Sequence, residues 1–226
     1  MITAKIIFFD LDGTLTDSKQ GIINSIRYTL DKMKLEENHI NLEQFIGPPL
    51  SESFEKYYGL DNKTARHAVA VYREYYTVKG IFENRVYPGI SELLKNLKEN
   101  NKTLVCVTSK AAFYAEQILD HFDLSQYLAR TVGSNMDLTC THKVELIKLA
   151  ISHFPEHSNS DFIMIGDRAD DIIGAKKNNI KSIGVLYGYG TSEEIKEQQP
   201  DYIVNSVKEL EKILLPNKRD SNNTVL

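Results

Sequence analysis

The sequence predicts an α/β fold, a three-layer sandwich in which helices cover both faces of a parallel sheet. Five short runs are apolar throughout instead of alternating, which is typical of strands buried on both faces. These runs are residues 4–9, 103–107, 162–165, 182–185 and 202–204. Helical patterns lie between them, for example over 172–179, and this alternation of strand and helix favours a parallel sheet.

The interval between the first two predicted strands is far longer than a crossover needs, and it predicts an inserted domain. Apolar residues follow helical spacing over 22–33 and again over 61–79. Between them, the Gly-Pro-Pro segment at 47–49 predicts a turn and the start of a short helix. We therefore expect a small all-helical domain after the first strand, at residues 15–85, which is called the helical insert below.

Length and composition agree with one core domain that carries an insert. The chain of 226 residues exceeds one usual domain and falls short of two. Hydrophobic residues make up 42% and charged residues 26%, which allows a sizeable core and excludes global disorder. We expect a core domain at residues 1–14 and 86–215, followed by a flexible polar tail at 216–226.

Charge and hydropathy exclude some classes of partner. With 27 Lys and Arg against 31 Asp and Glu, the net charge of −4 argues against binding to a nucleic acid polymer. No apolar run reaches the ~20 residues of a membrane span, and the beginning of the chain lacks a secretion signal. We expect a cytoplasmic protein without a membrane partner, either a monomer or a homodimer.

Two acidic motifs each follow a predicted strand. Asp10 and Asp12 are two residues apart, so an extended backbone directs both side chains to one face. Asp167 ends the third predicted strand, and either Asp170 or Asp171 could support it. Carboxylates gathered at neighbouring strand ends would repel one another without a cation. Oxygen ligands without Cys or His favour a hard ion, and Mg²⁺ is the usual choice beside a phosphorylated substrate.

Three further residues are candidates for binding an anion. Thr108 and Ser109 follow the second predicted strand, where hydroxyl and backbone N–H groups at the start of a helix suit an anion. Helix capping by Ser or Thr explains the same residues equally well. Lys143 begins another predicted helix, where a cation opposes the helix dipole unless it reaches an anion. A solvated surface lysine is the alternative.

Together these groups favour phosphoryl transfer. Asp10 would attack phosphorus as the nucleophile, and Asp12 would act as general acid to the leaving oxygen and then as base for water. Lys143 and the cation would offset charge on the transferring group. Hydrolysis would then proceed in two steps through an aspartyl-phosphate.

The two acidic motifs also carry a family resemblance. Asp10-Leu-Asp-Gly-Thr-Leu and Gly166-Asp-Arg-Ala-Asp-Asp171 resemble the first and fourth motifs of the haloacid dehalogenase (HAD) superfamily, over about residues 4–214. The resemblance implies a Rossmann-like parallel sheet. It also implies that the helical insert is a C1-type cap, as in phosphoglycolate phosphatases, β-phosphoglucomutases and some 5′-nucleotidases. Many relatives have Lys-Pro at the third motif, whereas Val144 follows Lys143 here.

The resemblance implies roles for the acidic residues. Asp10 would be both the nucleophile and a metal ligand. Asp12 would be the acid and base, and its backbone carbonyl would also bind the metal. Asp167 would hold Mg²⁺, with Asp171 supporting the site.

The resemblance also implies how the substrate is held. Thr108 and Lys143 would bind the phosphoryl group, helped by the backbone at Gly13 and Ser109. The loop of the helical insert that contains Gly47 and Pro48 is expected to face the substrate.

We expect a Mg²⁺-dependent phosphatase that acts on a small phosphorylated metabolite, either phosphoglycolate or a nucleoside 5′-monophosphate. A sugar phosphomutase of the β-phosphoglucomutase type would use the same covalent chemistry and stays open. A non-catalytic signalling module that is phosphorylated on aspartate, like a response-regulator receiver, is a more distant alternative. Receivers are shorter and lack a large insert after the first acidic strand.

Overall fold

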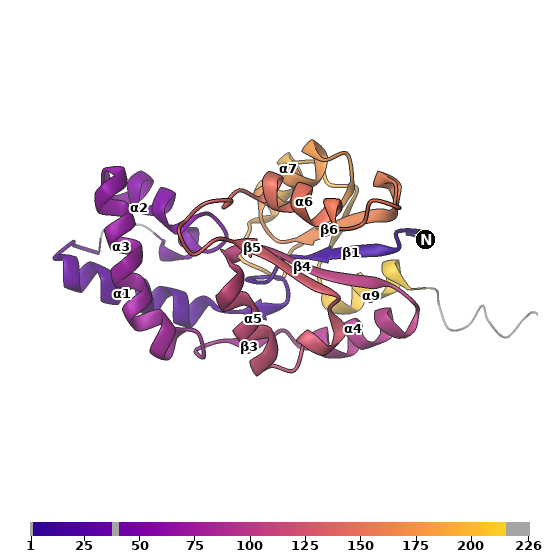
Figure 1. The fold of residues 1–226 in the computed structure, drawn as a ribbon, viewed down its shortest axis with the longest axis horizontal. Coiled ribbons are helices and arrows are strands. Elements are labelled where there is room, and N and C mark those ends of the chain that lie inside the picture. The colour runs from indigo at the N-terminus through magenta and orange to yellow at the C-terminus, as the bar shows by residue number, and fades with distance from the viewer. Residues whose placement is uncertain (1, 38–40, 216–226) are drawn as a thin grey trace, which may run out of the picture.

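The computed structural model describes residues 2–37 and 41–215, and it confirms the α/β fold (Figure 1). Within these residues, six parallel strands form one sheet in the order β5 (Arg130–Ser134), β4 (Thr103–Ala111), β1 (Ile6–Phe9), β6 (Phe162–Gly166), β7 (Lys181–Val185) and β8 (Tyr202–Val204). One face of the sheet is covered by α4 (Ile90–Glu99), α5 (Ala112–His121) and α9 (Val207–Leu214). The other face is covered by α6 (Lys143–Ser152) and α7 (Ala169–Lys177), with α8 (Ser192–Glu197) beside α7.

The central strand explains why the core has two halves. β1 is buried along its whole length, and its side chains alternate between the two faces of the sheet. Ile6 and Phe8 belong to the apolar cluster formed with α6 and α7. Ile7 and Phe9 belong to the larger cluster, which includes residues of α4, α5 and α9. A strand that packs on both faces reads as a continuous apolar run.

The segment between β1 and β4 is mainly helical. The part of it that forms the helical insert contains α1 (Lys19–Met33), α2 (Leu50–Tyr58), α3 (Asn62–Tyr75) and a π-helical turn (Tyr76–Gly80). One-turn 3₁₀ helices lie here at Leu42–Phe45 and elsewhere at Ser125–Tyr127 and Asn159–Asp161. The helix expected over 61–79 therefore ends at Tyr75 and continues as the π-helical turn.

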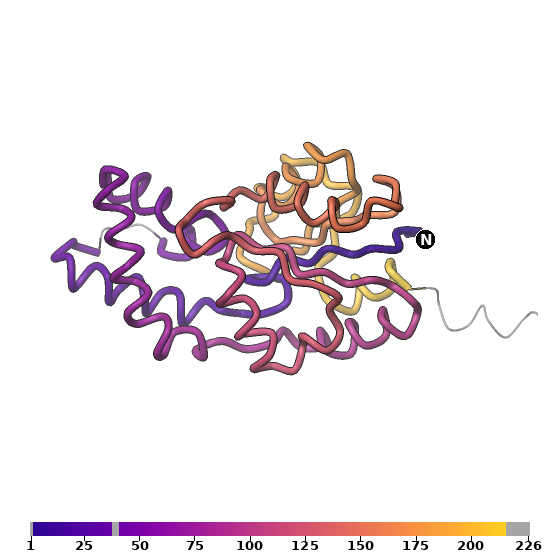
Figure 2. The backbone as a smooth tube through the Cα atoms, viewed as in Figure 1, coloured from indigo at the N-terminus to yellow at the C-terminus, as the bar shows by residue number. Residues whose placement is uncertain are grey.

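Two short strands connect the helical insert to the sheet. β2 (Thr16–Asp17) and β3 (Arg85–Val86) pair antiparallel, and the chain passes through this ribbon once in each direction (Figure 2). The domain boundaries expected from the sequence fall beside this ribbon and remain a prediction. The tail expected at 216–226 lies outside the described residues.

The strand register places the ends of three strands together. Phe9 of β1 aligns with Cys106 of β4 on one side and with Ile165 of β6 on the other. The backbone N–H of Asp10 then donates to the carbonyl of Ile165 at 2.9 Å, which extends the ladder by one step. The residues that follow all three strands therefore share one edge of the sheet, where open α/β sheets bind ligands.

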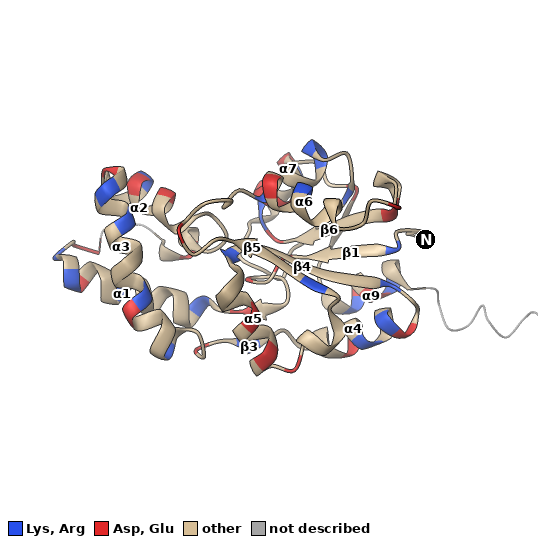
Figure 3. Cartoon of the chain, in the orientation of Figure 1, with Lys and Arg blue, Asp and Glu red and all other residues tan. Residues whose placement is uncertain are grey.

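Two whole-chain features bear on possible partners. In the described ranges, no helix combines the length and the apolar character that a membrane crossing requires. Basic and acidic residues are interspersed along the helices of both the insert and the core (Figure 3).

Candidate active site

Three acidic side chains meet at the carboxyl edge of the sheet. Asp10 follows β1, Asp167 follows β6, and Asp171 lies in the first turn of α7. One carboxylate oxygen from each lies within 4.8 Å of the others, and all three residues are buried. Asp170, by contrast, is exposed. Asp171 is therefore the residue of the Asp170-Asp171 pair that joins this carboxylate cluster.

Lys143 contacts the carboxylate cluster directly. Its Nζ lies 2.8 Å from Oδ1 of Asp10 and 2.8 Å from Oδ1 of Asp171. It also donates a hydrogen bond to the carbonyl of Val107 at 3.0 Å. The residue is only 5% exposed, so the surface interpretation of this lysine is wrong. Its position at the start of α6 is explained by the two carboxylates, which compensate for the unfavourable helix dipole.

The carboxylate cluster has more negative charge than Lys143 can offset. Burial, opposed by Lys143 and reinforced by Asp171, raises the pKa of Asp10 from 3.8 to about 6. Burial together with Asp10 and Asp171 raises the pKa of Asp167 well above its ordinary value. Burial alone would lower the pKa of Lys143, but the two carboxylates outweigh it and the net shift is upward.

The carboxylate cluster fits a hard divalent cation. All donor atoms are carboxylate oxygens, the type that Mg²⁺ prefers. With Mg–O bonds of about 2.1 Å, opposite ligands of an octahedral ion lie roughly 4 Å apart, close to the observed spread. A divalent cation would also favour the ionised carboxylates of Asp10 and Asp167, whose pKa values are raised by burial and by repulsion between the acids.

Asp167 is fixed by groups from two other segments. The hydroxyl of Thr14 donates to its Oδ1 at 3.0 Å, and the backbone N–H of Tyr189 donates to its Oδ2 at 2.7 Å. Gly13 has φ +86° and packs so closely that a Cβ would lie 2.2 Å from Oδ2 of Asp167. Only glycine fits there, for reasons of both conformation and space. Thr14 stands inside the first acidic motif but was assigned no role from the sequence, and Tyr189 was not a candidate because no spacing links it to Asp167.

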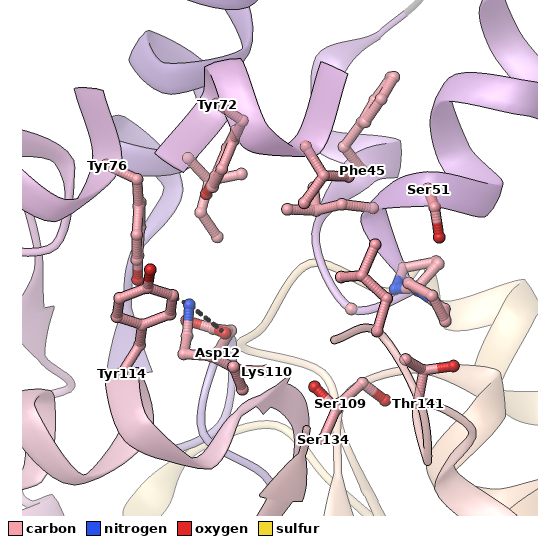
Figure 4. Close-up of a pocket in the computed structure, with 18 of the residues that line it drawn as sticks. Asp12, Phe45, Ser51, Tyr72, Tyr76, Ser109, Lys110, Tyr114, Ser134 and Thr141 are labelled. Atoms are coloured by element: carbon pink, nitrogen blue, oxygen red, sulfur yellow. Dashed lines mark hydrogen bonds and ion pairs between the residues drawn. The ribbon is translucent and has the colours of Figure 1, made fainter. Parts of the chain in front are cut away.

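Asp12 lies apart from the carboxylate cluster and pairs with another lysine. Its Oδ2 is 3.0 Å from Nζ of Lys110, which also donates to the phenol oxygen of Tyr76 at 2.8 Å (Figure 4). Its Oδ1 is buried and finds no hydrogen-bond partner among the described residues. Lys110 follows Thr108 and Ser109 directly, but nothing in the sequence indicated its partner or that Tyr76 of the insert would reach it.

The Thr108-Ser109 segment differs from its expected form. It was expected to begin a helix, but β4 continues to Ala111 and α5 begins only afterwards. The register shifts within this stretch: Thr108 aligns with Gly133, and the next aligned residue is Ala111. Such a bulge leaves residues out of the ladder and bends the strand. It places Ser109 beside the cavity, and the Thr108 hydroxyl accepts a bond from the backbone N–H of Lys110 at 3.2 Å.

A cavity lies between this edge of the sheet and the helical insert (Figure 4). The cavity is partly open to solvent, and the space in it that can hold water-sized groups is about 90 Å³. Asp12, Ser109 and Lys110 line it from the sheet, and Gly47 and Pro48 line it from the insert. The loop predicted to face the substrate therefore faces the same cavity as Asp12.

The parallel sheet, the helical insert and the aspartates after β1 and β6 agree with the architecture expected of a hydrolase of the haloacid dehalogenase type. Residues 7–185 match the family model of haloacid dehalogenase-like hydrolases. The chain belongs to this family.

Individual relatives carry phosphatase names in two cases and a kinase name in a third. The 5′-nucleotidase of Pseudomonas aeruginosa is 41% identical over 212 residues, which cover 92% of this chain and 94% of that protein. The tyrosine-protein kinase PtkA of Mycobacterium tuberculosis is 32% identical over 206 residues, which cover 89% of this chain and 69% of that protein. A crystal structure described as a predicted phosphatase from Clostridium acetobutylicum is 46% identical, with a TM-score of 0.89 and coverage of 93% and 98%. The chain is a phosphoric monoester hydrolase of the HAD type.

Proposed function

We propose that this chain is a Mg²⁺-dependent phosphatase that hydrolyses nucleoside 5′-monophosphates through an aspartyl-phosphate on Asp10. The main support is the separation of the two aspartates of the first motif. Asp10 lies in the carboxylate cluster beside Lys143, whereas Asp12 lines the adjacent cavity. This separation supports a role for Asp10 at the phosphoryl group and a role for Asp12 at the leaving group.

The carboxylate cluster would hold the ion. The side chains of Asp10, Asp167 and Asp171 and the backbone carbonyl of Asp12 are the proposed ligands. When bound, Mg²⁺ stabilises negative charge on the phosphoryl oxygens and lets a carboxylate approach them. The excess of negative charge in the cluster supports this role.

The reaction follows from the two carboxylates. An oxygen of Asp10 attacks phosphorus, the bond to the leaving oxygen breaks, and protonated Asp12 donates its proton to that oxygen. The Asp12 carboxylate then takes a proton from water, which attacks the phosphorus. The bond between phosphorus and Asp10 breaks, which releases inorganic phosphate and restores the free carboxylate of Asp10.

The phosphoryl oxygens would be bound by groups at the same edge of the sheet. The hydroxyl of Thr108, the ammonium of Lys143 and the backbone N–H group of Ser109 are the proposed donors. The backbone N–H of Gly13, which was also expected to help, already donates to the carbonyl of Thr16 at 2.8 Å. Thr108 is 1% exposed and lies in β4, the strand next to β1, two residues beyond the position that aligns with Phe9, which supports this placement. Donors that are fixed before the reaction stabilise developing charge without reorganisation.

The lining of the cavity favours a leaving group with a flat or apolar part. Aromatic side chains of Phe45, Tyr72 and Tyr114 line it together with the hydroxyl groups of serine and threonine residues. A nucleoside suits this lining better than the glycolate of phosphoglycolate. The name of the Pseudomonas relative points to the same substrate class.

A panel of phosphorylated metabolites tests the proposal by release of inorganic phosphate. We expect the highest kcat/KM for nucleoside 5′-monophosphates, a lower value for phosphoglycolate, no activity in EDTA, and recovery with Mg²⁺. Isomerisation of a sugar phosphate without phosphate release would instead indicate a mutase. A stable phosphoprotein without turnover after incubation with acetyl phosphate would indicate a receiver-like module. Transfer from ATP to a tyrosine peptide would contradict the phosphatase proposal as well.

A further inference from the structure

Arg168 connects the carboxylate edge of the sheet to the helical insert. It follows Asp167 directly, and its backbone N–H donates to Oδ2 of Asp171 at 3.1 Å. Its side chain points away from the cluster: Nη1 donates to the carbonyl of Ile46, in the loop of the insert that leads to Gly47. The side chain is only 15% exposed. One residue therefore touches both the carboxylate cluster and the loop that lines the cavity.

The loop of the insert is shaped to receive this side chain. Gly47 has φ +107°, a conformation that favours glycine, and a Cβ there would lie 2.8 Å from Cγ of Arg168. Ile46, whose carbonyl accepts the hydrogen bond, is fully buried. The stem of Arg168 thus packs against Gly47 while its guanidinium holds the preceding carbonyl.

Glu194 in α8 fixes the orientation of the guanidinium. Its Oε1 accepts from Nε of Arg168 at 2.8 Å and from the backbone N–H of Ala169 at 2.9 Å. This carboxylate oxygen is therefore anchored to the same turn that carries Arg168. Because the guanidinium is planar, the hydrogen bond at Nε restricts the positions that Nη1 can take. This restriction makes the hydrogen bond from Nη1 to the carbonyl of Ile46 specific.

We propose that Arg168 is a positioning residue that docks the Ile46–Pro48 loop onto the Asp167 turn and so fixes the cavity wall against which the leaving group rests. This inference rests on the proposed function for its choice of substrate. The docking itself is a property of the chain and can be measured without any substrate.

Docking predicts a defect that depends on the size of the leaving group. For Arg168→Met, we expect kcat/KM for a nucleoside 5′-monophosphate to fall about 10- to 100-fold, mainly through KM, because a charged hydrogen bond is lost. For acetyl phosphate, whose leaving group is acetate, we expect a change below about threefold. An equal loss for both substrates would overturn the inference, because it would indicate a general structural role.

Variants of Glu194 separate orientation from charge. Glu194→Gln keeps the Oε1 acceptor, so we expect nucleotide kinetics within about threefold of wild type. Glu194→Ala removes it, so we expect the same type of KM defect as Arg168→Met. A Glu194→Ala variant with unchanged KM would overturn the role of this carboxylate. The control is Arg27→Met, which removes an exposed pair with Glu37 inside the insert and should change neither substrate.

Hydrogen exchange of the protein without substrate keeps the inference testable if nucleotides are not hydrolysed. In Arg168→Met, we expect faster exchange at the amides of Ile46 and Gly47, while the amides of β6 keep their wild-type protection. Unchanged exchange in the loop would overturn the docking, whatever the substrate. Absence of nucleotide hydrolysis by the wild type, with faster loop exchange in the variant, would overturn only the proposed function.

Discussion

Lys110 and Asp12 form a buried ion pair between Nζ and Oδ2 at 3.0 Å, with only 9% and 10% of their side chains exposed. Nζ of Lys110 also donates to Tyr76, and the ammonium lies 4.8 Å from the centre of that ring. Tyr76 belongs to the helical insert, whereas Asp12 follows β1 and Lys110 lies near the end of β4. The candidate acid and base is therefore held by a lysine that depends on the insert for part of its own environment.

Lys110→Met should lower both stability and turnover. The change leaves the Asp12 carboxylate buried without its partner, and breaking a buried pair costs about 3–5 kcal/mol. We expect kcat to fall about 10- to 100-fold, because Asp12 loses a fixed orientation but keeps its carboxyl group. Urea unfolding and phosphate release measure the two effects.

The matched control is Lys95→Met. Lys95 forms an exposed pair with Glu99, with 60% of each side chain exposed, so its loss should change stability by less than about 0.5 kcal/mol. If Lys110→Met behaves like this control, the buried pair has no role in holding Asp12.

The buried strands and the acids that follow them could be predicted from the sequence because local composition determines both. β1 and β6 are short apolar runs that end in aspartate, and the parallel order brings their ends together. β5 was missed because Arg130–Ser134 contains a single large apolar residue, Val132, and the strand lies at the edge of the sheet. An edge strand buries less, so its composition carries a weaker signal.

The contacts made by residues distant in sequence could not be predicted. Lys110 reaches Asp12 because of a bulge in β4, and a bulge depends on the register of the neighbouring strand. Tyr76 and Arg168 find their partners across the junction between insert and core, which sequence periodicity does not describe. Lys143 was a candidate only because a cation at a helix start is unusual, and its two carboxylate partners explain that position.

Asp10→Asn should abolish turnover while the protein stays folded. The amide cannot attack phosphorus, and neutralising one member of a crowded carboxylate cluster removes repulsion. Asp12→Ala should retain the nucleophile but lose about 10²- to 10⁴-fold in rate, the usual contribution of a general acid and base. Phosphate release at saturating substrate measures both. Wild-type rates in Asp10→Asn would exclude Asp10 as the nucleophile.

The stability of Asp10→Asn relative to wild type should depend on pH in metal-free buffer. The pKa of Asp10 is raised from 3.8 to about 6 in the folded protein, mainly by burial. The folded state therefore binds this proton more tightly, and ionisation of Asp10 destabilises the wild type as pH rises through that window. We expect the variant to gain stability relative to wild type from about pH 4 to pH 6, with a plateau above.

Urea unfolding at several pH values in EDTA measures this difference, and Mg²⁺ supplies the control. Saturating Mg²⁺ should stabilise the wild type at neutral pH more than the variant, because the ion requires ionised carboxylates. A difference in stability that does not vary with pH would contradict the raised pKa of Asp10.

Lys143→Met should destabilise the metal-free protein more strongly at pH 7.5 than at pH 5. Removing the ammonium leaves the carboxylate cluster without its cation, at a cost of about 3–5 kcal/mol when the acids are ionised. At lower pH, protons on Asp10 and Asp167 relieve part of the repulsion, because both pKa values are raised. Urea unfolding measures the loss, and Mg²⁺ should restore part of it. Equal losses at both pH values would show that packing, not charge, determines the effect.

Gly188→Ala should weaken Mg²⁺ binding more than it weakens the fold. Gly188 lies in the loop after β7, where a Cβ would be 2.4 Å from Cβ of Asp167 and 2.4 Å from the carbonyl oxygen of Gly13. Neither atom can move aside without shifting the Asp167 carboxylate or the backbone after β1. We expect the apparent Mg²⁺ affinity, measured by calorimetry, to fall by more than about tenfold, because ligand geometry for this ion is strict.

Gly59→Ala is the control: its Cβ would meet nothing within 4 Å, although its φ of +64° makes alanine unfavourable. That variant should lose about 1 kcal/mol of stability and keep its Mg²⁺ affinity, because the strain lies at the end of α2 in the helical insert and not beside a residue of the carboxylate cluster. If the two variants lose Mg²⁺ affinity equally, the close packing of Gly188 against Asp167 does not position the metal ligand.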